Sequence, residues 1–281
     1  MEFVKMHAAL NDYVYCDYEK VKSYDFSSLA IAVSKRHFSI GADGLIIVKK
    51  LNQTSAQMIM FNADGSRGAT CGNGVRCSAF FAKKYLGLVG DEIVIKTDSN
   101  QTTVQLYKKD GKVFARADMG CVKEINSSLK IALALQKIGL YVDYRQVFQM
   151  DTGNKHLVFF YPNHSLFSLA SAVEKTKLFP DGINVERVYK ISNDGCLTRI
   201  YGEVFERGSG KTLSCGSGAC AIFSSFRLFS KGEDNLAEVI TDGGCLTVER
   251  KGQRTFLQSP INEVFKGDLF TENIDEIQPK F

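Results

Sequence analysis

Two cysteines stand immediately before similar glycine-rich segments, and both could carry a proton in a reaction. Cys71 begins Cys-Gly-Asn-Gly, and Cys215 begins Cys-Gly-Ser-Gly. The segments that follow, 75–85 and 219–229, lack Pro and Gly and are rich in Ala, Ser and Phe, which predicts about three helical turns in each. A cysteine at a helix N-terminus lies in a positive field that favours the thiolate. We therefore expect both thiols to have lowered pKa values and to transfer protons.

The two motifs belong to an internal repeat. Three pairs of landmarks occur in one order at an offset of 143 or 144 residues: Asn11 with Asn154, Asn62 with Glu206, and Cys71 with Cys215. Such agreement indicates two homologous halves. We expect them to be related by a pseudo-twofold axis with an active site at its centre.

The elements that position these cysteines are predicted to be strands around buried helices. Segments 45–48, 93–95, 102–107 and 157–161 are rich in Val, Ile, Phe and Tyr or Thr and read as strands. The two helices after the cysteines are apolar on all sides, which is typical of burial. The predicted fold is α+β, with two pseudo-symmetric lobes, each a strongly curved mixed or antiparallel β-sheet wrapped around a central helix.

Composition excludes several classes of protein. The 281 residues are 44% hydrophobic and 23% charged, as in ordinary globular proteins, and the net charge of +4 is scattered along the chain. We therefore expect no nucleic-acid partner, and because no apolar run approaches the ~20 residues of a membrane span, no membrane partner. The N-terminal residues lack the pattern of a signal peptide, so a cytoplasmic protein is expected.

The eight cysteines are expected to be reduced, and no metal site is predicted. They are spread through a long chain, and none forms the CxxC pair that seeds a structural zinc site. The six cysteines other than Cys71 and Cys215 are interpreted as packing residues. Two glycine-rich strings, 208–212 and 216–221, resemble phosphate-binding loops, but Phe205 stands where a P-loop needs glycine and the second string is a loose match. No nucleotide cofactor is expected.

Uncharged amide side chains, and a Glu-Arg motif that occurs in only one half of the repeat, suggest a substrate with two opposite charges. Amide side chains can bind an ammonium and a carboxylate without adding charge, and four candidates lie at glycine-rich or strand-end positions: Asn11, Asn62, Asn154 and Asn184. Glu206 and Arg207 have no charged counterparts in the first half and are suited to an ammonium and a carboxylate respectively. The alternatives are turn roles for the asparagines and a surface ion pair for Glu206 and Arg207.

His156 is a further candidate, because it lies two residues after Asn154. An imidazole titrates near neutrality and could tune a nearby thiol. A core or surface histidine is the alternative. Two thiols about one pocket suit inversion at a carbon, in which one removes a proton and the other returns one to the opposite face. At rest, one would be thiolate and the other thiol.

The chain resembles the diaminopimelate epimerase family from end to end. The resemblance rests on a series of motifs: Lys5-Met-His before Asn11-Asp-Tyr-Val, Arg36-His-Phe, Gly41-Ala-Asp-Gly-Leu, Phe61-Asn-Ala-Asp-Gly-Ser, Ala69-Thr-Cys-Gly-Asn-Gly-Val-Arg-Cys, Gly153-Asn-Lys-His, Phe179-Pro with Asn184, Glu206-Arg-Gly-Ser-Gly and Ser214-Cys-Gly-Ser-Gly-Ala-Cys-Ala. It implies an isomerase that interconverts LL- and meso-diaminopimelate without pyridoxal phosphate or any other cofactor. It also implies a homodimer, with an N-terminal lobe at 1–115 completed by 263–281 and a C-terminal lobe at 116–262.

The resemblance also implies roles for individual residues. Cys71 and Cys215 become the acid/base pair, and His156 and Glu206 modulate the thiols. The backbone cradle for the reacting carboxylate is formed by Gly72, Asn73, Gly216 and Ser217. The remaining substrate contacts are Asn11, Asn62, Asn154, Asn184, Glu206 and Arg207.

Several positions depart from the family pattern and bear on substrate identity. Ala8, Ala9 and Leu10 stand at the usual Gly-x-Gly before Asn11, and Gly44 stands where some members have a substrate-binding glutamine. Lys155 and Lys211 replace a common proline and a common acidic residue. Two alternatives therefore stay open: a racemase of another amino acid, such as histidine, and a non-catalytic amino-acid-binding or thiol-sensing protein.

Overall fold

A computed structural model describes residues 1–68 and 71–269, and the chain divides into two compact units. The first unit comprises Met1–Ala117 and the chain from Ser259 onward, and the second comprises Asp118–Gln258. Both combine sheets with helices, so the expected α+β fold is confirmed. Ala69, Thr70 and residues 270–281, which include most of the predicted C-terminal completion of the first lobe, lie outside the described residues.

The first unit is built on one mixed sheet. Its strands are β1 (Glu2–Ala8), β2 (Asn11–Asp17), β3 (Gly44–Lys50), β4 (Ser55–Asn62), β5 (Arg67–Gly68), β6 (Glu92–Lys96), β7 (Gln101–Lys109), β8 (Lys112–Asp118) and β18 (Asn262–Asp268). Along the sheet the order is β18, β1, β2, β3, β4, β6, β7, β8. The β2–β3 and β4–β6 pairs are parallel and the others antiparallel, with β5 added to β4 as a short antiparallel partner.

The second unit repeats this arrangement. Its strands are β9 (Lys123–Ile125), β10 (Val147–Asp151), β11 (Lys155–Phe160), β12 (Asn184–Asn193), β13 (Thr198–Glu206), β14 (Gly210–Thr212), β15 (Leu236–Thr241), β16 (Gly244–Lys251) and β17 (Arg254–Pro260). The order is β9, β10, β11, β12, β13, β15, β16, β17, with β11–β12 and β13–β15 parallel and β14 added to β13. The succession of parallel and antiparallel pairs matches the first unit, which agrees with the repeat in the sequence.

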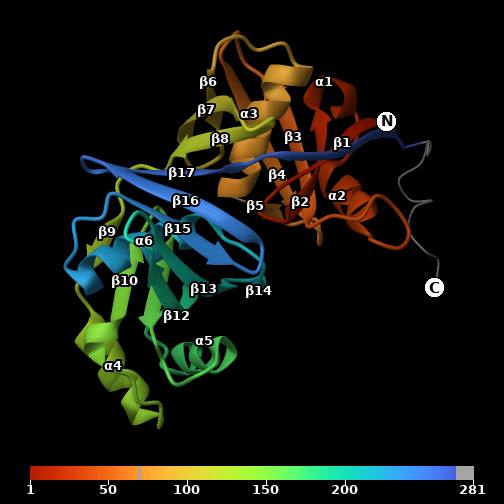
Figure 1. Cartoon of the computed structure of the whole chain (residues 1–281). Coiled ribbons are helices and arrows are strands. Elements are labelled where there is room, and N and C mark those ends of the chain that lie inside the picture. Colours follow the sequence, from red (N-terminus) through yellow and green to blue (C-terminus); the bar gives the residue numbers. More distant parts are fainter. Residues whose placement is uncertain (69–70, 270–281) are drawn as a thin grey trace. The chain divides into compact units, whose positions relative to one another are not determined.

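Each sheet surrounds one helix that begins directly after a motif cysteine (Figure 1). Helix α3 (Gly72–Tyr85) contacts β1, β2, β3, β4, β6 and β7, and α6 (Gly216–Ser230) contacts β10 to β13, β15 and β16. Both helices start three residues earlier than the apolar patterns at 75 and 219 predict, because the glycine-rich segments form the first helical turns. Buried residues run along most of both helices, as expected.

The remaining helices cover the outer faces of the sheets. They are α1 (Tyr18–Val21), α2 (Phe26–Ser34), α4 (Ser128–Lys137), α5 (Leu166–Lys175) and a 3-10 turn at Tyr144–Gln146. Parallel neighbours need a crossover, and α2 and α5 lie in the β2–β3 and β11–β12 connections. Asp25 and Ser165 cap α2 and α5 with side-chain hydrogen bonds, a start signal that is readable in the sequence.

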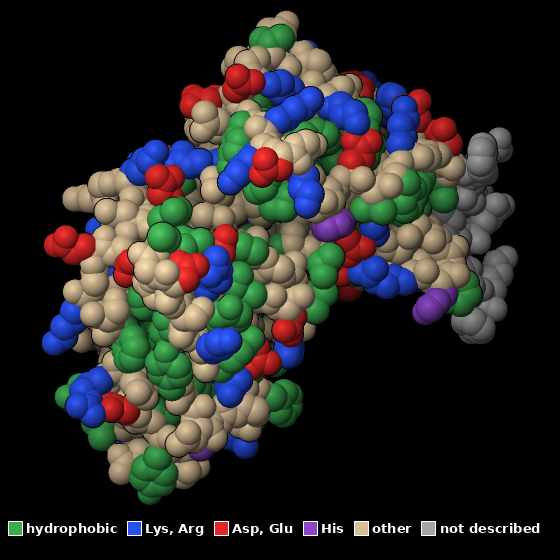
Figure 2. All heavy atoms as spheres, viewed as in Figure 1, with side chains coloured by type: hydrophobic (Ala, Val, Ile, Leu, Met, Phe, Trp, Pro, Cys, Tyr) green, Lys and Arg blue, Asp and Glu red, His purple; other side chains and the backbone are tan. Residues whose placement is uncertain are grey.

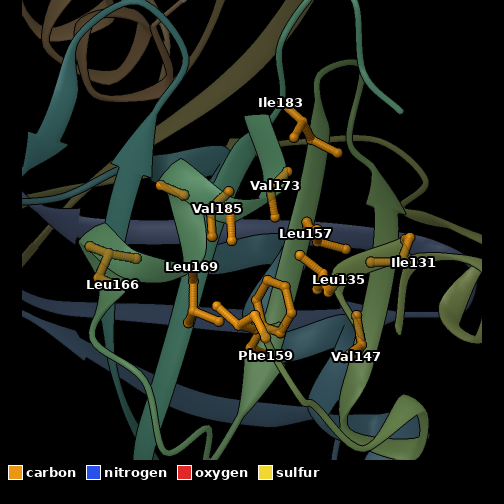
Figure 3. Packing of buried hydrophobic residues seen from close by; sticks show 13 residues of the cluster. Ile131, Leu135, Val147, Leu157, Phe159, Leu166, Leu169, Val173, Ile183 and Val185 are labelled. Atoms are coloured by element: carbon orange, nitrogen blue, oxygen red, sulfur yellow. The ribbon is translucent and has the colours of Figure 1, made fainter. Parts of the chain in front are cut away.

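The second unit has two different faces on its sheet. Leu157 and Phe159 of β11 and Val185 of β12 point into an apolar cluster with α4 and α5 (Figure 3). Alternate residues of a strand point to opposite faces, so His156 of β11 and Glu186 of β12 face α6 instead. The outer face supplies the core of this layer, and the inner face carries polar groups beside the helix that begins after Cys215.

The surface carries both signs of charge. Lys and Arg side chains are interspersed with Asp and Glu on the visible face (Figure 2). Among residues 1–68 and 71–269, no helix is long and apolar enough to cross a membrane.

The turn before Asn11 keeps a glycine-type conformation without glycine. The β1–β2 register pairs Ala8 with Asn11, so Ala9 and Leu10 form a two-residue hairpin turn. Their φ angles are +52° and +60°, as a type I′ turn requires. An L side chain in this region costs roughly 1–2 kcal/mol. Ala9 and Leu10 therefore adopt glycine-type φ angles in the turn before Asn11 at a cost in stability.

Replacing Leu10 with glycine is expected to stabilise the protein. Relief of the positive φ outweighs the extra flexibility of glycine in the unfolded chain, for a net gain of about 0.5–1 kcal/mol. The urea concentration at half unfolding should rise, whereas Leu10→Val, which puts a β-branched residue at the same φ, should lower it. An equal or lower midpoint for Leu10→Gly would contradict this account of the turn.

Candidate functional site

Both motif cysteines are N-caps of the central helices. Cys71 has φ −132° and ψ 116°, and Cys215 has φ −125° and ψ 122°, the extended backbone usual for a cap. Each sulfur accepts a hydrogen bond from the backbone N–H three residues later, at 3.3 Å from Gly74 and 3.4 Å from Gly218. The thiols thus face the open amides of a helix N-terminus, where an anion is also stabilised.

A side chain at either glycine whose amide reaches a sulfur would press on a neighbouring side chain. A Cβ at Gly74 would lie 2.7 Å from Ile46 Cδ1, and one at Gly218 would lie 2.9 Å from Glu186 Oε1. A larger residue at either place would displace these neighbours. The spacing Cys-Gly-x-Gly therefore serves close packing as well as exposure of the backbone.

In the first unit, Cys71 lies beside Asn11 and Tyr13. The thiol donates to Asn11 Oδ1 at 3.2 Å. Tyr13 is buried, and burial together with the neighbouring Cys71 raises the pKa of its hydroxyl well above 10. Asn11, which is expected to contact substrate, therefore lies against the thiol of the first motif, and the phenol of Tyr13 stays neutral beside the same thiol.

A charged network fixes the segment that carries Asn11. Asn11 Nδ2 donates to Asp43 Oδ2 at 3.1 Å, and Arg36 bridges Asp43 and Asp12 at 2.9 and 2.7 Å. Lys5 forms a further ion pair with Asp12 at 2.6 Å. Against the effect of burial, hydrogen bonds from Arg36 and Lys5 lower the pKa of Asp12 to about 2. Sequence reasoning missed these supports, although the family motifs contain all of them.

The other candidates of the first unit lie at its strand and helix ends. Asn62 ends β4, pairs with Gly44 in register and donates to Ser66 Oγ at 2.9 Å. Asn73, in the first turn of α3 after Gly72, is buried, and its Oδ1 accepts from Arg76 at 2.6 Å. Asn73 is therefore positioned by its side chain, which leaves its backbone for the proposed cradle.

Gly44 has no room for the glutamine of some family members. A Cβ at this position would lie 2.2 Å from the carbonyl oxygen of Phe61 on the paired strand. Any side chain here requires the β3 and β4 backbones to separate. The departure is thus built into the local strand pairing.

In the second unit, Cys215 is a buried thiol beside carboxylates. Burial raises its pKa well above 9, and the charges of Glu206 and Glu186 raise it further. Hydrogen bonding to Ser217, whose Oγ lies 3.3 Å from the sulfur, and to the Gly218 amide acts in the opposite direction but is weaker. The expectation that the helix N-terminus lowers this pKa is therefore wrong for Cys215, because burial and nearby carboxylates outweigh the helix field.

His156 is paired with a residue that sequence reasoning missed. Its Nδ1 lies 2.6 Å from Glu186 Oε1, and both side chains are fully buried. Glu186 follows Asn184 by two residues on β12, and this parallel strand pairs His156 with Asn184. The available signal is Asn-Val-Glu at 184–186, in which alternation places the carboxylate on the same face as the asparagine.

Asn184, Glu206 and Arg207 meet at the ends of β12 and β13. Asn184 Nδ2 donates to the carbonyl of Lys155 at 2.9 Å, and its Oδ1 accepts from the backbone N–H of Arg207 at 2.9 Å. Glu206 Oε1 accepts from Thr212 Oγ1 at 2.6 Å, and Arg207 Nη1 donates to the Asp181 carbonyl at 3.0 Å. Both charged side chains are thus held by neutral groups of the same unit, and no bond between Glu206 and Arg207 is needed to position them.

Asn154 lies apart from this hydrogen-bonded group. It is exposed in the turn between β10 and β11, where its carbonyl accepts from the Thr152 amide at 3.0 Å. Gly216 and Ser217 form the first turn of α6. The structure therefore connects most of the second-unit candidates through β11, β12 and α6, and leaves the Asn154 side chain on the surface.

The interpretation of the other six cysteines is half correct. Cys16, Cys77 and Cys220 are buried, and burial raises the pKa of Cys16 and of Cys77 to about 12. Cys121, Cys196 and Cys245 are exposed, so the prediction that they pack in the core is wrong. They lie near strand ends, where the chain turns at the surface.

Each unit thus offers a thiol at open helix amides, with amide or carboxylate side chains beside it. In the described part of the chain, no three His, Cys, Asp or Glu side chains are grouped as a metal site would need. Such an arrangement can hold a carboxylate and move a proton. The thiol supplies the acid/base group, and the helix N-terminus supplies the charge stabilisation.

Comparison with known proteins gives one consistent family. The family model for diaminopimelate epimerase matches residues 3–125 and 148–261. A diaminopimelate epimerase of Agathobacter rectalis is 33% identical and covers 96% of this chain and 99% of its own. One from Bacteroides thetaiotaomicron is 32% identical and covers 96% and 98%.

Solved structures with low sequence identity share the fold. A PhzF-family phenazine biosynthesis protein of Bacillus anthracis superposes with a TM-score of 0.69 at 15% identity and covers 96% of this chain and 99% of its own. A probable proline racemase of Agrobacterium radiobacter, with bound carbonate, gives 0.59 at 12% identity and covers 95% and 92%. The family match and the relatives together show that the chain belongs to the diaminopimelate epimerase family and is an isomerase of the amino-acid epimerase class.

Proposed function

We propose that this protein converts LL-diaminopimelate to meso-diaminopimelate, with Cys71 and Cys215 as its two acid/base groups. The observation that carries the proposal is that each unit presents one cysteine as the N-cap of its buried central helix. An epimerase that uses no electron-sink cofactor needs one group that accepts the Cα proton and another that donates a proton to the opposite face. Two thiols can fill these two roles.

The proposed reaction is a proton exchange at one carbon. One cysteine, as thiolate, removes the Cα proton, and the C–H electron pair stays on the substrate as a carbanion conjugated with the carboxylate. The other cysteine, as thiol, donates its proton to the opposite face. One C–H bond breaks and one forms, one S–H bond forms and one breaks, and no oxidant or reductant takes part.

The carbanion has to be stabilised by the protein. We assign this role to the backbone amides of Gly72 with Asn73 and of Gly216 with Ser217, because amides at a helix N-terminus favour negative charge on a bound carboxylate. Water exclusion from the site strengthens this interaction. The high pKa of a Cα–H makes such stabilisation the most demanding part of the reaction.

Substrate recognition is assigned to the polar groups held near the strand ends. Glu206 would bind an ammonium and Arg207 a carboxylate, and the amides Asn11, Asn62, Asn154 and Asn184 would complete the contacts. This set suits a substrate with a second amino-acid head group rather than a plain side chain. Asn184 and Glu206 are held in place by hydrogen bonds from the Arg207 amide and from Thr212, respectively. This favours fixed rather than adaptable contacts with the substrate.

A racemase of another amino acid is the second candidate, and Gly44 is the observation that favours it. The glutamine contact of some family members is missing here, and the Phe61 carbonyl occupies the space of a Cβ. A substrate with one head group would need fewer contacts.

A panel of amino acids in deuterium oxide should identify the substrate. We expect deuterium to enter Cα of LL- and meso-diaminopimelate, without added pyridoxal phosphate, because the thiols exchange their protons with solvent. Mass spectrometry of each amino acid gives the readout, with histidine as the main comparison. Exchange confined to histidine or another mono-amino acid would replace the proposed substrate, and tight binding without exchange would indicate a binding protein.

Replacement of either motif cysteine should abolish turnover. Cys71→Ala and Cys215→Ala are each expected to lower kcat by a factor of about 10²–10⁴, the usual contribution of a general acid or base. Circular dichroism detects epimerisation of the chiral substrate, and Cys196→Ala, which removes an exposed thiol, is the matched control. Turnover retained in either motif variant would refute the two-thiol scheme.

The proposal extends to the cell compartment and the oligomeric state. The reaction requires Cys71 and Cys215 in reduced form, which the cytoplasm provides. The homodimer implied by the family resemblance is retained as a proposal, and neither nucleic acid nor membrane is assigned a role.

A further inference from the structure

Glu186 is a buried carboxylate without a role in the scheme above. Its side chain has no solvent exposure, and it lies on the α6-facing side of β12. Isolated carboxylates are costly to bury and persist where a partner or a function retains them. Its contact is His156 on the neighbouring parallel strand, at 2.6 Å between Oε1 and Nδ1.

The carboxylate is directed at the N-terminus of α6. A Cβ at residue 218 would lie 2.9 Å from Glu186 Oε1 and 3.5 Å from Cys215 Sγ. The carboxylate oxygen and the sulfur therefore both lie close to one position, which carries no Cβ because residue 218 is glycine.

Each residue of the pair also has one buried polar atom that takes no part in the hydrogen bond between them. Glu186 Oε2 and His156 Nε2 are inaccessible to solvent and lack a hydrogen-bond partner among the described residues. An apolar replacement for the pair would avoid this cost. The arrangement is therefore better suited to control of charge beside Cys215 than to stability.

We propose that Glu186 is a positioning residue that, anchored by His156, keeps Cys215 in the thiol form, so that Cys215 enters the reaction as the proton donor. The inference rests on the proposed function, in which Cys215 is one of the two acid/base groups. His156 Nδ1–H donates to the ionised carboxylate and fixes its orientation. The negative charge then opposes formation of a thiolate at Cys215.

Other groups around Cys215 also shift the pKa of its thiol. Glu206 of β13 also opposes the thiolate, whereas Ser217 and the Gly218 amide of α6 favour it. Burial raises the pKa of Cys215 and of Glu186, and His156 lowers that of Glu186. Loss of the Glu186 charge should therefore lower the Cys215 pKa, since of the two carboxylate charges only that of Glu206 would remain.

The test is the pH dependence of Cys215 alkylation in the full chain without substrate. Iodoacetamide modification of the Cys215 peptide, followed by mass spectrometry, should still accelerate above pH 9 in the wild type because only the thiolate reacts. In Glu186→Gln the midpoint should fall by up to about one pH unit, which makes the reaction about three- to tenfold faster at pH 8. Limited access to the buried sulfur lowers the alkylation rate at every pH but does not change the midpoint of the pH profile.

Glu203→Gln is the matched control. This glutamate lies on β13, pairs with Arg187 and Lys211 at 2.9 and 2.8 Å, and is not among the main groups that shift the pKa of Cys215. Its profile should match the wild type. An unchanged midpoint in Glu186→Gln, or an equal shift in Glu203→Gln, would overturn the proposal.

A second measurement on the wild type serves if Glu186→Gln does not fold. The ¹⁵N shifts of His156 should show a protonated Nδ1, as donation to an ionised carboxylate requires. An unprotonated Nδ1 would mean that Glu186 carries the proton and would overturn the assignment. Neither measurement uses substrate turnover, so failure of the proposed function and failure of this inference are distinguishable.

Discussion

The capping of a buried helix by a cysteine is the constraint on which the rest of this structure depends. A helix N-terminus leaves backbone amides without partners, and here the sulfur of the cap accepts one of them. The glycines that follow let the chain pack closely and keep the remaining amides open. Each sheet in turn encloses the helix and excludes water from most of its length. The same arrangement therefore positions a thiol, offers donors to a carboxylate and defines the core of its unit.

The two units place the same structural element, a central helix capped by a cysteine, in different electrostatic surroundings. Cys71 has the neutral amide of Asn11 and the phenol of Tyr13 beside it, whereas Cys215 faces two carboxylates. A repeated fold can thus place two similar thiols in different electrostatic surroundings. Such a difference suits a reaction in which one group accepts a proton while its counterpart donates one.

Much of this organisation was predictable from the sequence, because the two cysteine motifs and the matched offset fix the repeat, the central helices and the candidate thiols. What the sequence did not reveal depends on long-range contacts. The burial of Cys215 and the charges of Glu206 and Glu186 reverse the pKa shift expected from the helix field alone. The turn at Ala9 and Leu10 adopts positive φ without glycine because the β1–β2 register imposes it. The exposed Cys121, Cys196 and Cys245 show that residue type alone does not predict burial.

The two-thiol claim is tested most directly by following where solvent hydrogen appears in the first few per cent of a reaction run in deuterium oxide. With separate donor and acceptor thiols, the product should carry deuterium at the inverted carbon, while the recovered starting isomer keeps its original hydrogen. Deuterium in the starting isomer at the same rate as in the product would mean that a single group both removes and returns the proton, and would contradict the account.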